Sequence, residues 1–194
     1  MFTHMAGSET LGTKARIARE ALRLFVEKGI TETTVRDITA AVGITEGALY
    51  RHYASKEALA WELFSSNFVA FAKRMEAVRQ QHDDLRSRLE TMIHMFCAFF
   101  DEDPVLFSFL LLAQHNEARK ITPDMPHPVT IMRACIEEGM QAGDIPKADP
   151  DFATAVVLGI VFEVATFKIY GRIQGGLGDL APDVMRTCWR ALGA

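Results

Sequence analysis

Three adjacent side chains, Tyr50, Arg51 and His52, offer several hydrogen-bond donors and one aromatic face within a short stretch of the chain. Donors of this kind bond to base edges and to phosphate oxygens in nucleic acids. Gly47 and Ala48 precede them and keep one side of the segment small, which allows a close approach to base edges. This combination predicts a segment that binds in a groove of double-stranded DNA.

Lys56 and Thr34 are suited to phosphate. Lys56 lies in the first turn of an expected helix, where its charge opposes the helix dipole by about 0.3–1 kcal/mol unless an anion binds nearby. Thr33 and Thr34 stand at another helix start, whose free N–H groups favour phosphate. We expect Lys56 to contact phosphate, and the alternative is a solvated surface lysine.

Two short helices are expected to position these side chains. The sequence Thr34-Val35-Arg36-Asp37 has the form of a capping box, and Gly43 supplies the turn that ends this helix. Thr45 can cap the next helix, from Glu46 to about Tyr53. Two short helices joined by a tight glycine turn form a helix-turn-helix, whose second helix enters the major groove.

The remaining elements are also expected to be helices. A first helix should run from a Thr13 cap to the stop at Lys28-Gly29, and Ser55 can cap a long fourth helix that ends near Gln81. Five further helices are expected at 83–100, 104–120, 128–142, 149–174 and 180–192. The chain is therefore predicted to be all-α, with about nine helices: a three-helix head and a helical bundle behind it. The expected division is a flexible tail at 1–12, the DNA-binding domain at 13–57, and a ligand-binding and dimerisation domain at 58–194.

Composition narrows the class of protein. Hydrophobic residues make up 49% of the 194 residues, which supports a sizeable core, and the net charge is −4. Residues 1–57 carry a net charge of +1 and the remainder carries −5. A constitutive architectural DNA-binding protein would need a broad basic surface, so this charge balance argues against that class.

Several features favour a cytoplasmic protein without a membrane partner. The three cysteines are odd in number and widely spaced, as expected of free buried thiols in a reducing compartment. The first ten residues lack the basic and apolar regions of a signal peptide. The most apolar stretch, 152–170, includes Glu163 and Lys168, and we interpret it as a buried helix rather than a membrane span.

The segment from 13 to about 60 resembles the TetR family of bacterial regulators. The resemblance rests on TTVRDI at 33–38, the Gly43 turn, GALYRHY at 47–53 and SKEAL at 55–59, in order and at matching spacing. It covers about a quarter of the chain. It implies that Thr34 and Arg36 contact the DNA backbone and Lys56 a phosphate, and that the following residues contact the groove or flanking phosphates: Thr45, Gly47, Tyr50, Arg51 and His52. Glu46 has two open roles: it could accept from a cytosine amino group, or only favour the helix N-terminus.

The body is rich in Phe and Met. The resemblance implies a cavity between its helices that binds a small, mostly apolar effector. The candidate lining residues are Met92, Met95, Phe96, Phe99, Phe107, Phe162 and Phe167. For any one of these residues, ordinary core packing is the alternative. Few charged residues fall among them, so a strongly charged ligand is not expected.

The last two helices are expected to form a homodimer interface. They are apolar on more than one side, and a helix that is apolar all round must be covered all round. The candidate interface residues are Val157, Ile160, Val161, Val164 and Trp189. A two-fold dimer would read a palindromic operator. Ligand binding beside the long fourth helix could then change the spacing of the two heads and release the DNA.

Other functions find less support in the sequence. An enzyme or small-molecule carrier with a docking head is the second hypothesis, but no hydrolase, zinc-protease, phosphate-loop or dinucleotide motif is present. Glu90 and His94 could share a helix face as metal ligands, yet a second such pair is missing. We therefore expect no metal, no cofactor and no catalytic site. The sequence predicts a transcriptional regulator of the repressor type that a small ligand releases from DNA.

Overall fold

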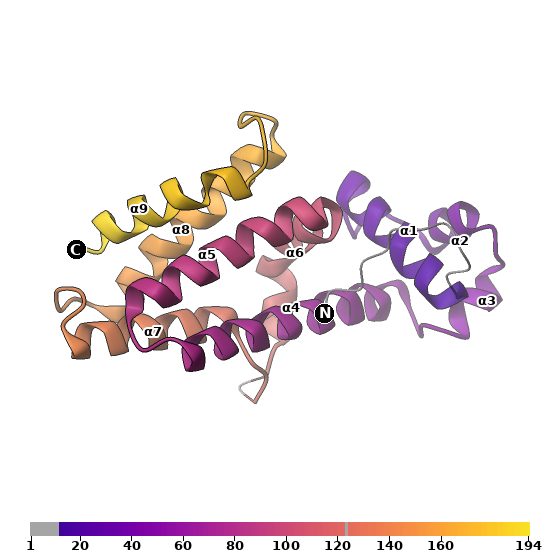
Figure 1. Cartoon of the computed structure of the whole chain (residues 1–194). Helices are drawn as coiled ribbons and strands as arrows, with labels where there is room; N and C mark the ends of the chain where they lie inside the picture. The colour runs from indigo at the N-terminus through magenta and orange to yellow at the C-terminus, as the bar shows by residue number, and fades with distance from the viewer. Residues whose placement is uncertain (1–11, 123) are drawn as a thin grey trace. The chain divides into compact units, whose positions relative to one another are not determined.

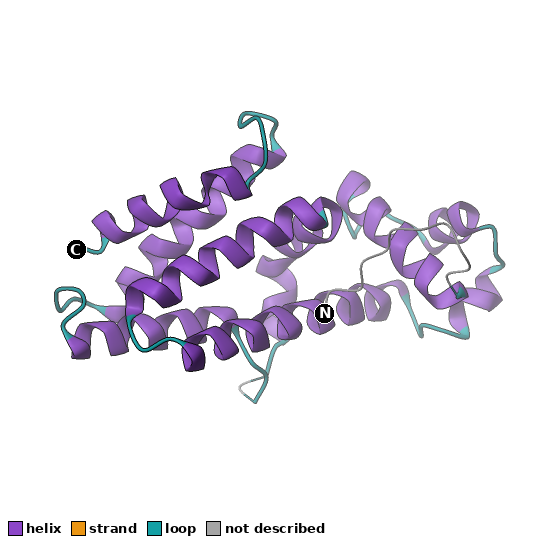
Figure 2. Cartoon of the chain, viewed as in Figure 1, coloured by secondary structure: helices purple, strands orange, loops and turns teal. Residues whose placement is uncertain are grey.

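The computed structural model describes residues 12–122 and 124–194, which form nine α-helices and two short 3₁₀ helices, with no strand among them (Figure 1; Figure 2). The predicted all-α class and the number of helices are therefore confirmed. Apart from Gly12, the tail expected at 1–12 lies outside the described residues. The chain divides into two compact units, Met1–Phe64 and Ser65–Ala194, and the division falls inside a helix rather than at residue 57.

The first unit contains α1 (Thr13–Lys28), α2 (Val35–Val42), α3 (Glu46–Tyr50) and the beginning of α4 (Lys56–Gln81). Each of these helices contributes at least one apolar side chain that is fully or almost fully buried in the small core of the first unit. These residues are Ile17, Phe25, Ile38, Leu49, Leu59 and Phe64. With so small a core, the polar contacts at the helix ends matter for the position of each helix.

The predicted capping box of α2 is confirmed. The Thr34 hydroxyl accepts the Asp37 N–H at 3.1 Å, while the Asp37 carboxylate accepts the Thr34 N–H at 2.9 Å. Gly43 ends the helix with a left-handed φ of 74°, a conformation that L side chains rarely adopt. The expected Thr13 cap is wrong, because Thr13 is itself the first helical residue and Gly12 precedes it without a side-chain cap.

Polar side chains also join α1 to α2. Arg16 donates to the Val42 carbonyl at the end of α2. Thr33 is fully buried, and its hydroxyl donates to the carbonyl oxygens of Leu24 and Gly29 at the end of α1, at 3.2 and 2.7 Å. Thr33 therefore does not face a phosphate, contrary to the sequence prediction; its hydroxyl stabilises the turn between the two helices.

The second unit continues α4 and adds the remaining helices. These are α5 (Leu85–Glu102), α6 (Pro104–Glu117), α7 (Pro128–Ala142), α8 (Pro150–Ile169) and α9 (Ala181–Ala191), with 3₁₀ turns at Ala118–Lys120 and Gly178–Leu180. Within this unit α5 packs against α6, α7, α8 and α9, and α8 packs against both α7 and α9 (Figure 1). The three cysteines are free and buried as predicted, and burial raises the pKa of each thiol to about 11.

The end of α8 differs from the prediction. The helix stops at Ile169 instead of 174, because Gly171 turns the chain with a left-handed φ of 68°. The loop that follows is held by Asp101 of α5, whose carboxylate accepts the N–H groups of Leu177 and Gly178, each at 2.8 Å. This anchor sets where α9 begins.

α8 is also more apolar and more exposed than expected. By length and composition alone it could cross a membrane, a property that core helices of soluble proteins share. However, only 28% of its apolar window is buried within the chain, so its interpretation as a buried helix is wrong for the chain taken alone. A large apolar surface of α8 is left for another partner.

Candidate nucleic-acid interface and apolar cavity

α3 presents a short exposed surface that ends in Tyr50. Thr45 caps the helix, as predicted, by accepting the Ala48 N–H at 3.2 Å. Leu49 is fully buried and fixes the helix to the core, whereas Glu46 and Gly47 are exposed. The Tyr50 ring is 49% exposed. One side of α3 therefore anchors the helix, and the other leaves small and aromatic groups on the surface.

Arg51 and His52 lie just beyond this helix rather than on it. α3 ends at Tyr50, where the prediction extended it to about Tyr53. Both the His52 and Tyr53 N–H groups donate to the Leu49 carbonyl, at 2.9 and 3.0 Å, which makes a tight turn before α4. Tyr53 is buried, so the turn faces Arg51 and His52 outward. The three donor residues of the sequence motif thus remain adjacent and exposed.

Three exposed donor side chains of the first unit have no partner in the part of the chain that the structure describes. The side chains of Arg36 on α2, Arg51 and His52 form no hydrogen bond or ion pair there. Thr34 and Thr45 are exposed too, although their hydroxyls already serve as caps. Unpartnered donors that gather on one surface are what phosphate and base-edge contacts require.

Lys56 differs from the other candidates. Its ammonium donates to the carbonyl oxygens of Ile30 and Thr31, at 2.6 and 3.1 Å, and its side chain is only 14% exposed. It thereby joins the start of α4 to the loop before α2. This structural role explains a lysine in the first turn of a helix without any phosphate, so the phosphate contact stays a prediction.

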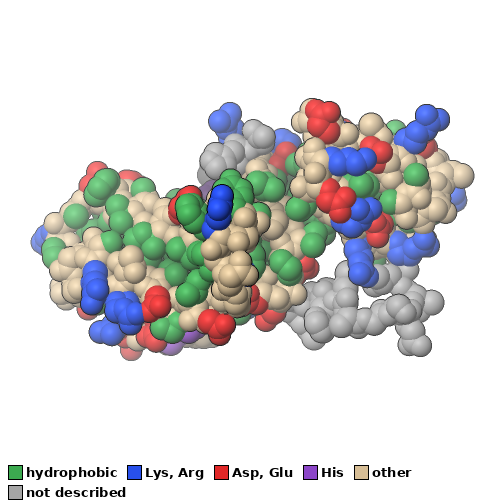
Figure 3. Space-filling model, turned by 90° about the horizontal axis from the view of Figure 1, so that it is seen from above, with side chains coloured by type: hydrophobic (Ala, Val, Ile, Leu, Met, Phe, Trp, Pro, Cys, Tyr) green, Lys and Arg blue, Asp and Glu red, His purple; other side chains and the backbone are tan. Residues whose placement is uncertain are grey.

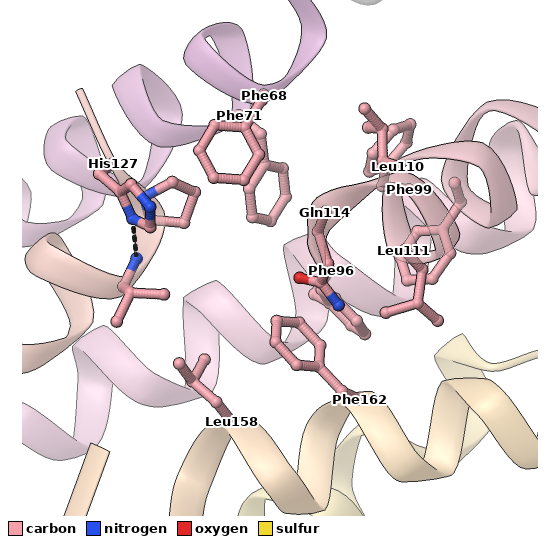
Figure 4. A pocket seen from close by; sticks show the side chains of 13 residues that line it. Phe68, Phe71, Phe96, Phe99, Leu110, Leu111, Gln114, His127, Leu158 and Phe162 are labelled. Atoms are coloured by element: carbon pink, nitrogen blue, oxygen red, sulfur yellow. Dashed lines mark hydrogen bonds between the residues drawn. The ribbon is translucent and has the colours of Figure 1, made fainter. Parts of the chain in front are cut away.

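An apolar cavity of about 360 Å³ lies in the second unit, among α4, α5, α6, α7 and α8 (Figure 4). Phenylalanine and leucine dominate its wall. The lining residues are Phe68, Phe71, Phe96, Phe99, Phe107, Leu110, Leu111, Gln114, His127, Pro128, Val129, Leu158 and Phe162. Its volume falls within the range of about 300–1,000 Å³ that is typical of small-molecule sites.

Four of the seven predicted lining residues meet in this wall: Phe96, Phe99, Phe107 and Phe162. The Phe96 ring lies 4.7 Å from Phe107 and 5.8 Å from Phe162, centroid to centroid. The other three predicted lining residues are not part of the cavity wall. Met92 is buried in the core, Met95 lies outside the wall, and Phe167 is 46% exposed.

Among the side chains that the structure describes, two polar ones, Gln114 and His127, line the apolar cavity. The Gln114 amide faces the cavity in Figure 4 and has no partner among the described residues. His127 caps α7 by accepting the Val129 N–H through Nδ1, at 3.2 Å. Its ring also meets the edge of Phe68, with centroids 5.1 Å apart. The sequence analysis missed both, although a histidine directly before Pro128 at a helix start was a visible capping signal.

A second, more polar cavity of about 530 Å³ has His127 in its wall as well. Its charged lining side chains are Lys73, Glu76 and Asp124. Glu76 is already paired with Arg79, at 2.9 Å. Elsewhere in the described part of the chain, no three His, Cys, Asp or Glu side chains are placed to hold a metal ion.

None of the five candidate interface residues is exposed, and the four on α8 lie on the side of that helix opposite its exposed face. Val157 and Val161 are buried in the unit's own core, so their assignment to an interface is wrong. Ile160, Val164 and Trp189 are only half-buried, and Arg86 lies over the Trp189 ring at 5.7 Å. The exposed face of α8 instead adds Phe152, Phe167 and Tyr170. Figure 3 shows hydrophobic side chains gathered on a face of this unit.

The family model described as bacterial regulatory proteins, tetR family, matches residues 17–63. Over 156 residues the chain is 26% identical to the fatty acid metabolism regulator protein of Bacillus subtilis, covering 78% of this chain and 80% of that protein. It is 36% identical over 75 residues to the HTH-type transcriptional regulator YerO of the same species, covering 39% of this chain. That alignment spans 25% of the length of YerO.

The fold also matches a solved structure over nearly its whole length. The transcriptional regulator FadR of Bacillus subtilis, crystallised with stearoyl-CoA, superposes with a TM-score of 0.71. The match covers 90% of this chain and 96% of that one, at 20% sequence identity. At this identity the likeness extends to the fold, and the ligand named is that of the other protein.

Proposed function

We propose that this chain, in which residues 17–63 match the tetR family model, is a cytoplasmic repressor that binds a palindromic DNA operator as a homodimer and is released by a small, mostly apolar ligand. One observation carries the DNA-binding part of the proposal. A five-residue helix, held in place by buried Leu49, is followed by exposed and unpartnered Arg51 and His52. These are donors without a use inside the chain.

We propose that α2 and α3 are the two helices of a helix-turn-helix. α3 enters the major groove with Tyr50, Arg51 and His52 at its end, while Arg36 and the N–H groups at the start of α2 contact phosphates. Glu46 at the start of α3 could accept from a cytosine amino group. No catalytic role is proposed for any residue.

The homodimer is proposed to form on α8 and α9. The apolar face of α8 that the chain leaves uncovered needs a partner, and the same face of a second copy is complementary to it by symmetry. Gly159 lies on this face, and a methyl group added there would meet no atom of the chain within 4 Å. Because Gly159 has no side chain, a second helix could approach closely at this point, one turn before the exposed Glu163.

The effector is proposed to bind in the apolar cavity. A wall dominated by Phe and Leu suits a hydrocarbon ligand, and the ligand of the FadR structure, stearoyl-CoA, has a long hydrocarbon chain. α4 is one continuous helix that contains both Lys56 and the cavity residues Phe68 and Phe71. A ligand that prefers the non-operator arrangement of the dimer would weaken DNA binding by about 5- to 150-fold.

A salt titration of DNA binding tests this proposal. Fluorescence anisotropy would compare random duplex with duplex selected by the protein, from 50 to 300 mM salt. A specific regulator retains a preference of about 10³-fold or more for the selected duplex at physiological salt. Equal affinity for both duplexes at every salt concentration would identify a non-specific binder and contradict the proposal.

A further inference from the structure

The polar groups around the apolar cavity restrict the chemistry of its ligand. His127 is half-buried, and burial lowers the pKa of its imidazole, so the ring is neutral at neutral pH. Because Nδ1 accepts the Val129 N–H, the single ring proton must be on Nε2. The cap of α7 therefore fixes the tautomer, and it leaves one N–H donor on a ring that lines the cavity.

Gln114 supplies the other polar group. Its amide faces the same cavity from α6, and among the described residues it has no hydrogen-bond partner (Figure 4). An unpaired amide donor and an unpaired imidazole N–H are both satisfied by an oxygen that accepts hydrogen bonds. The remaining lining residues carry apolar side chains, so the rest of the ligand must be hydrocarbon.

The second cavity argues against a phosphate-bearing headgroup. It shares His127 with the apolar cavity, and its charged lining consists of one cation, Lys73, and two carboxylates, Glu76 and Asp124. Recognition of a polyphosphate requires several Arg or Lys donors around the anion. Lys73 is the one Arg or Lys among the lining residues described for this wall, and the Asp124 carboxylate would repel a phosphate.

We propose that the effector is an uncharged, mostly hydrocarbon compound with one carbonyl oxygen, that His127 or Gln114 donates a hydrogen bond to this oxygen, and that coenzyme A thioesters are excluded. The inference rests on the proposed function, because it assigns the effector to the apolar cavity. It makes His127 or Gln114 a specificity-determining residue.

The test uses the full chain and a matched pair of probes, 2-acetylnaphthalene and 2-ethylnaphthalene, which have similar shapes but differ in the carbonyl oxygen. Isothermal titration calorimetry is expected to show that the acetyl compound binds about 2- to 12-fold more tightly, the range of one neutral hydrogen bond. Octanoyl-CoA is expected to bind more weakly than either. Failure of both probes to bind, equal affinity for the two, or tighter binding of octanoyl-CoA would overturn the proposal.

Two variants separate recognition from folding. In His127→Asn the side-chain oxygen can still cap α7, but the imidazole donor is lost; in Gln114→Met the shape is kept and the amide is lost. One of the two variants should bring the affinity ratio of the two probes toward one, and neither should change the melting temperature much. A ratio that stays at the wild-type value in both variants would overturn the assignment of these residues.

DNA release is measured separately, by adding each probe to the complex with selected duplex. If the acetyl probe binds with the expected preference but does not release the DNA even at saturation, the proposed effector function fails while the chemistry of the cavity stands. If octanoyl-CoA releases the DNA and neither naphthalene does, the function stands and this inference fails.

Discussion

The helices within each of the two units are held in place by a different kind of interaction. In the first unit, polar side chains fix the helix ends: the Thr34–Asp37 capping box, Arg16 on the end of α2, and Lys56 on the loop before it. In the second unit, packed aromatic rings join the helices; Phe107 alone meets Phe96, Phe99 and Phe100, at centroid distances of 4.7, 5.6 and 5.0 Å. Directional contacts suit a surface that must present donors in fixed positions, and aromatic packing suits a cavity that must adapt to a ligand.

The exposed surfaces of the units differ in the same way. Around α3, the exposed groups are donors that lack partners, among them Arg51 and His52. On α8 and directly after it, large apolar groups are exposed, among them Phe152 and Tyr170, each 69% exposed. In the proposed function, DNA binds to the first surface and a second copy of the chain covers the other. Each of the following predictions tests one side of this comparison.

The largest effect is expected from Tyr50→Ala or Arg51→Ala. Loss of a base contact costs about 1–3 kcal/mol, and a symmetric dimer carries the change twice, so affinity for selected duplex should fall by about 30-fold to 10⁴-fold. Neither side chain is needed for the core, so the melting temperature should stay within about 1–2 °C of the parent. Arg19→Ala, which removes another exposed arginine from α1, serves as the control. A folded Arg51→Ala protein with parental affinity would remove the turn after α3 from the interface.

A smaller effect is expected from Gly159→Arg on α8. The new side chain meets nothing within its own chain but would lie between two copies, so dimer dissociation should become at least about 30-fold easier. Light scattering after size-exclusion chromatography reports the mass, and Lys147→Ala in an exposed loop is the control. If the parent protein is itself a monomer at micromolar concentration, or the variant stays as dimeric as the parent, α8 is not the interface.

Lys56→Met distinguishes a structural lysine from a phosphate ligand. Ile30 and Thr31 lose a charged donor, so the free energy of unfolding should drop by about 1–3 kcal/mol in either case. If Lys56 also contacts a phosphate, the slope of log affinity against log salt should decrease in magnitude by about one unit for each lysine lost. A lower stability with an unchanged salt slope would leave Lys56 with the structural role alone.

The smallest effect concerns the acid stability of the first unit. Hydrogen bonds from the Thr34 backbone and hydroxyl, and then from Lys28, lower the pKa of Asp37 from 3.8 to about 2. A carboxylate with a lowered pKa stabilises the fold above its unfolded pKa, and this contribution is lost as the pH falls from about 4 to 2. The melting temperature of Asp37→Asn should therefore lie below that of the parent at pH 6, and the two should converge near pH 2. A difference that is constant from pH 6 to 2 would contradict the role of the carboxylate charge.

The sequence predicted the first unit well because its signals are local. Thr34 with Asp37, Gly43, and Thr45 each specify a cap or a turn within four residues of themselves. The end of α3 was misjudged because the buried position of Tyr53 depends on the rest of the unit, which no local pattern records.

The second unit was harder to predict for a physical reason. α8 carries apolar residues on more than one side, so its sequence did not reveal that Val157 and Val161 face the chain's own core while Phe152 and Phe167 are exposed. The cavity likewise depends on how five helices converge, and its polar residues, Gln114 and His127, carry no motif for ligand binding. Periodicity locates helices, but only packing decides which side of a largely apolar helix is covered.

The most direct test of the central claim is selection of binding sites from a random pool of DNA duplexes by the purified full-length protein, with Tyr50→Ala run in parallel. The account predicts that the parent protein enriches one two-fold symmetric sequence, and that the variant does not. No enrichment by the parent, or the same enriched sequence with the variant, would contradict the assignment of α3 and its turn as the surface that reads DNA.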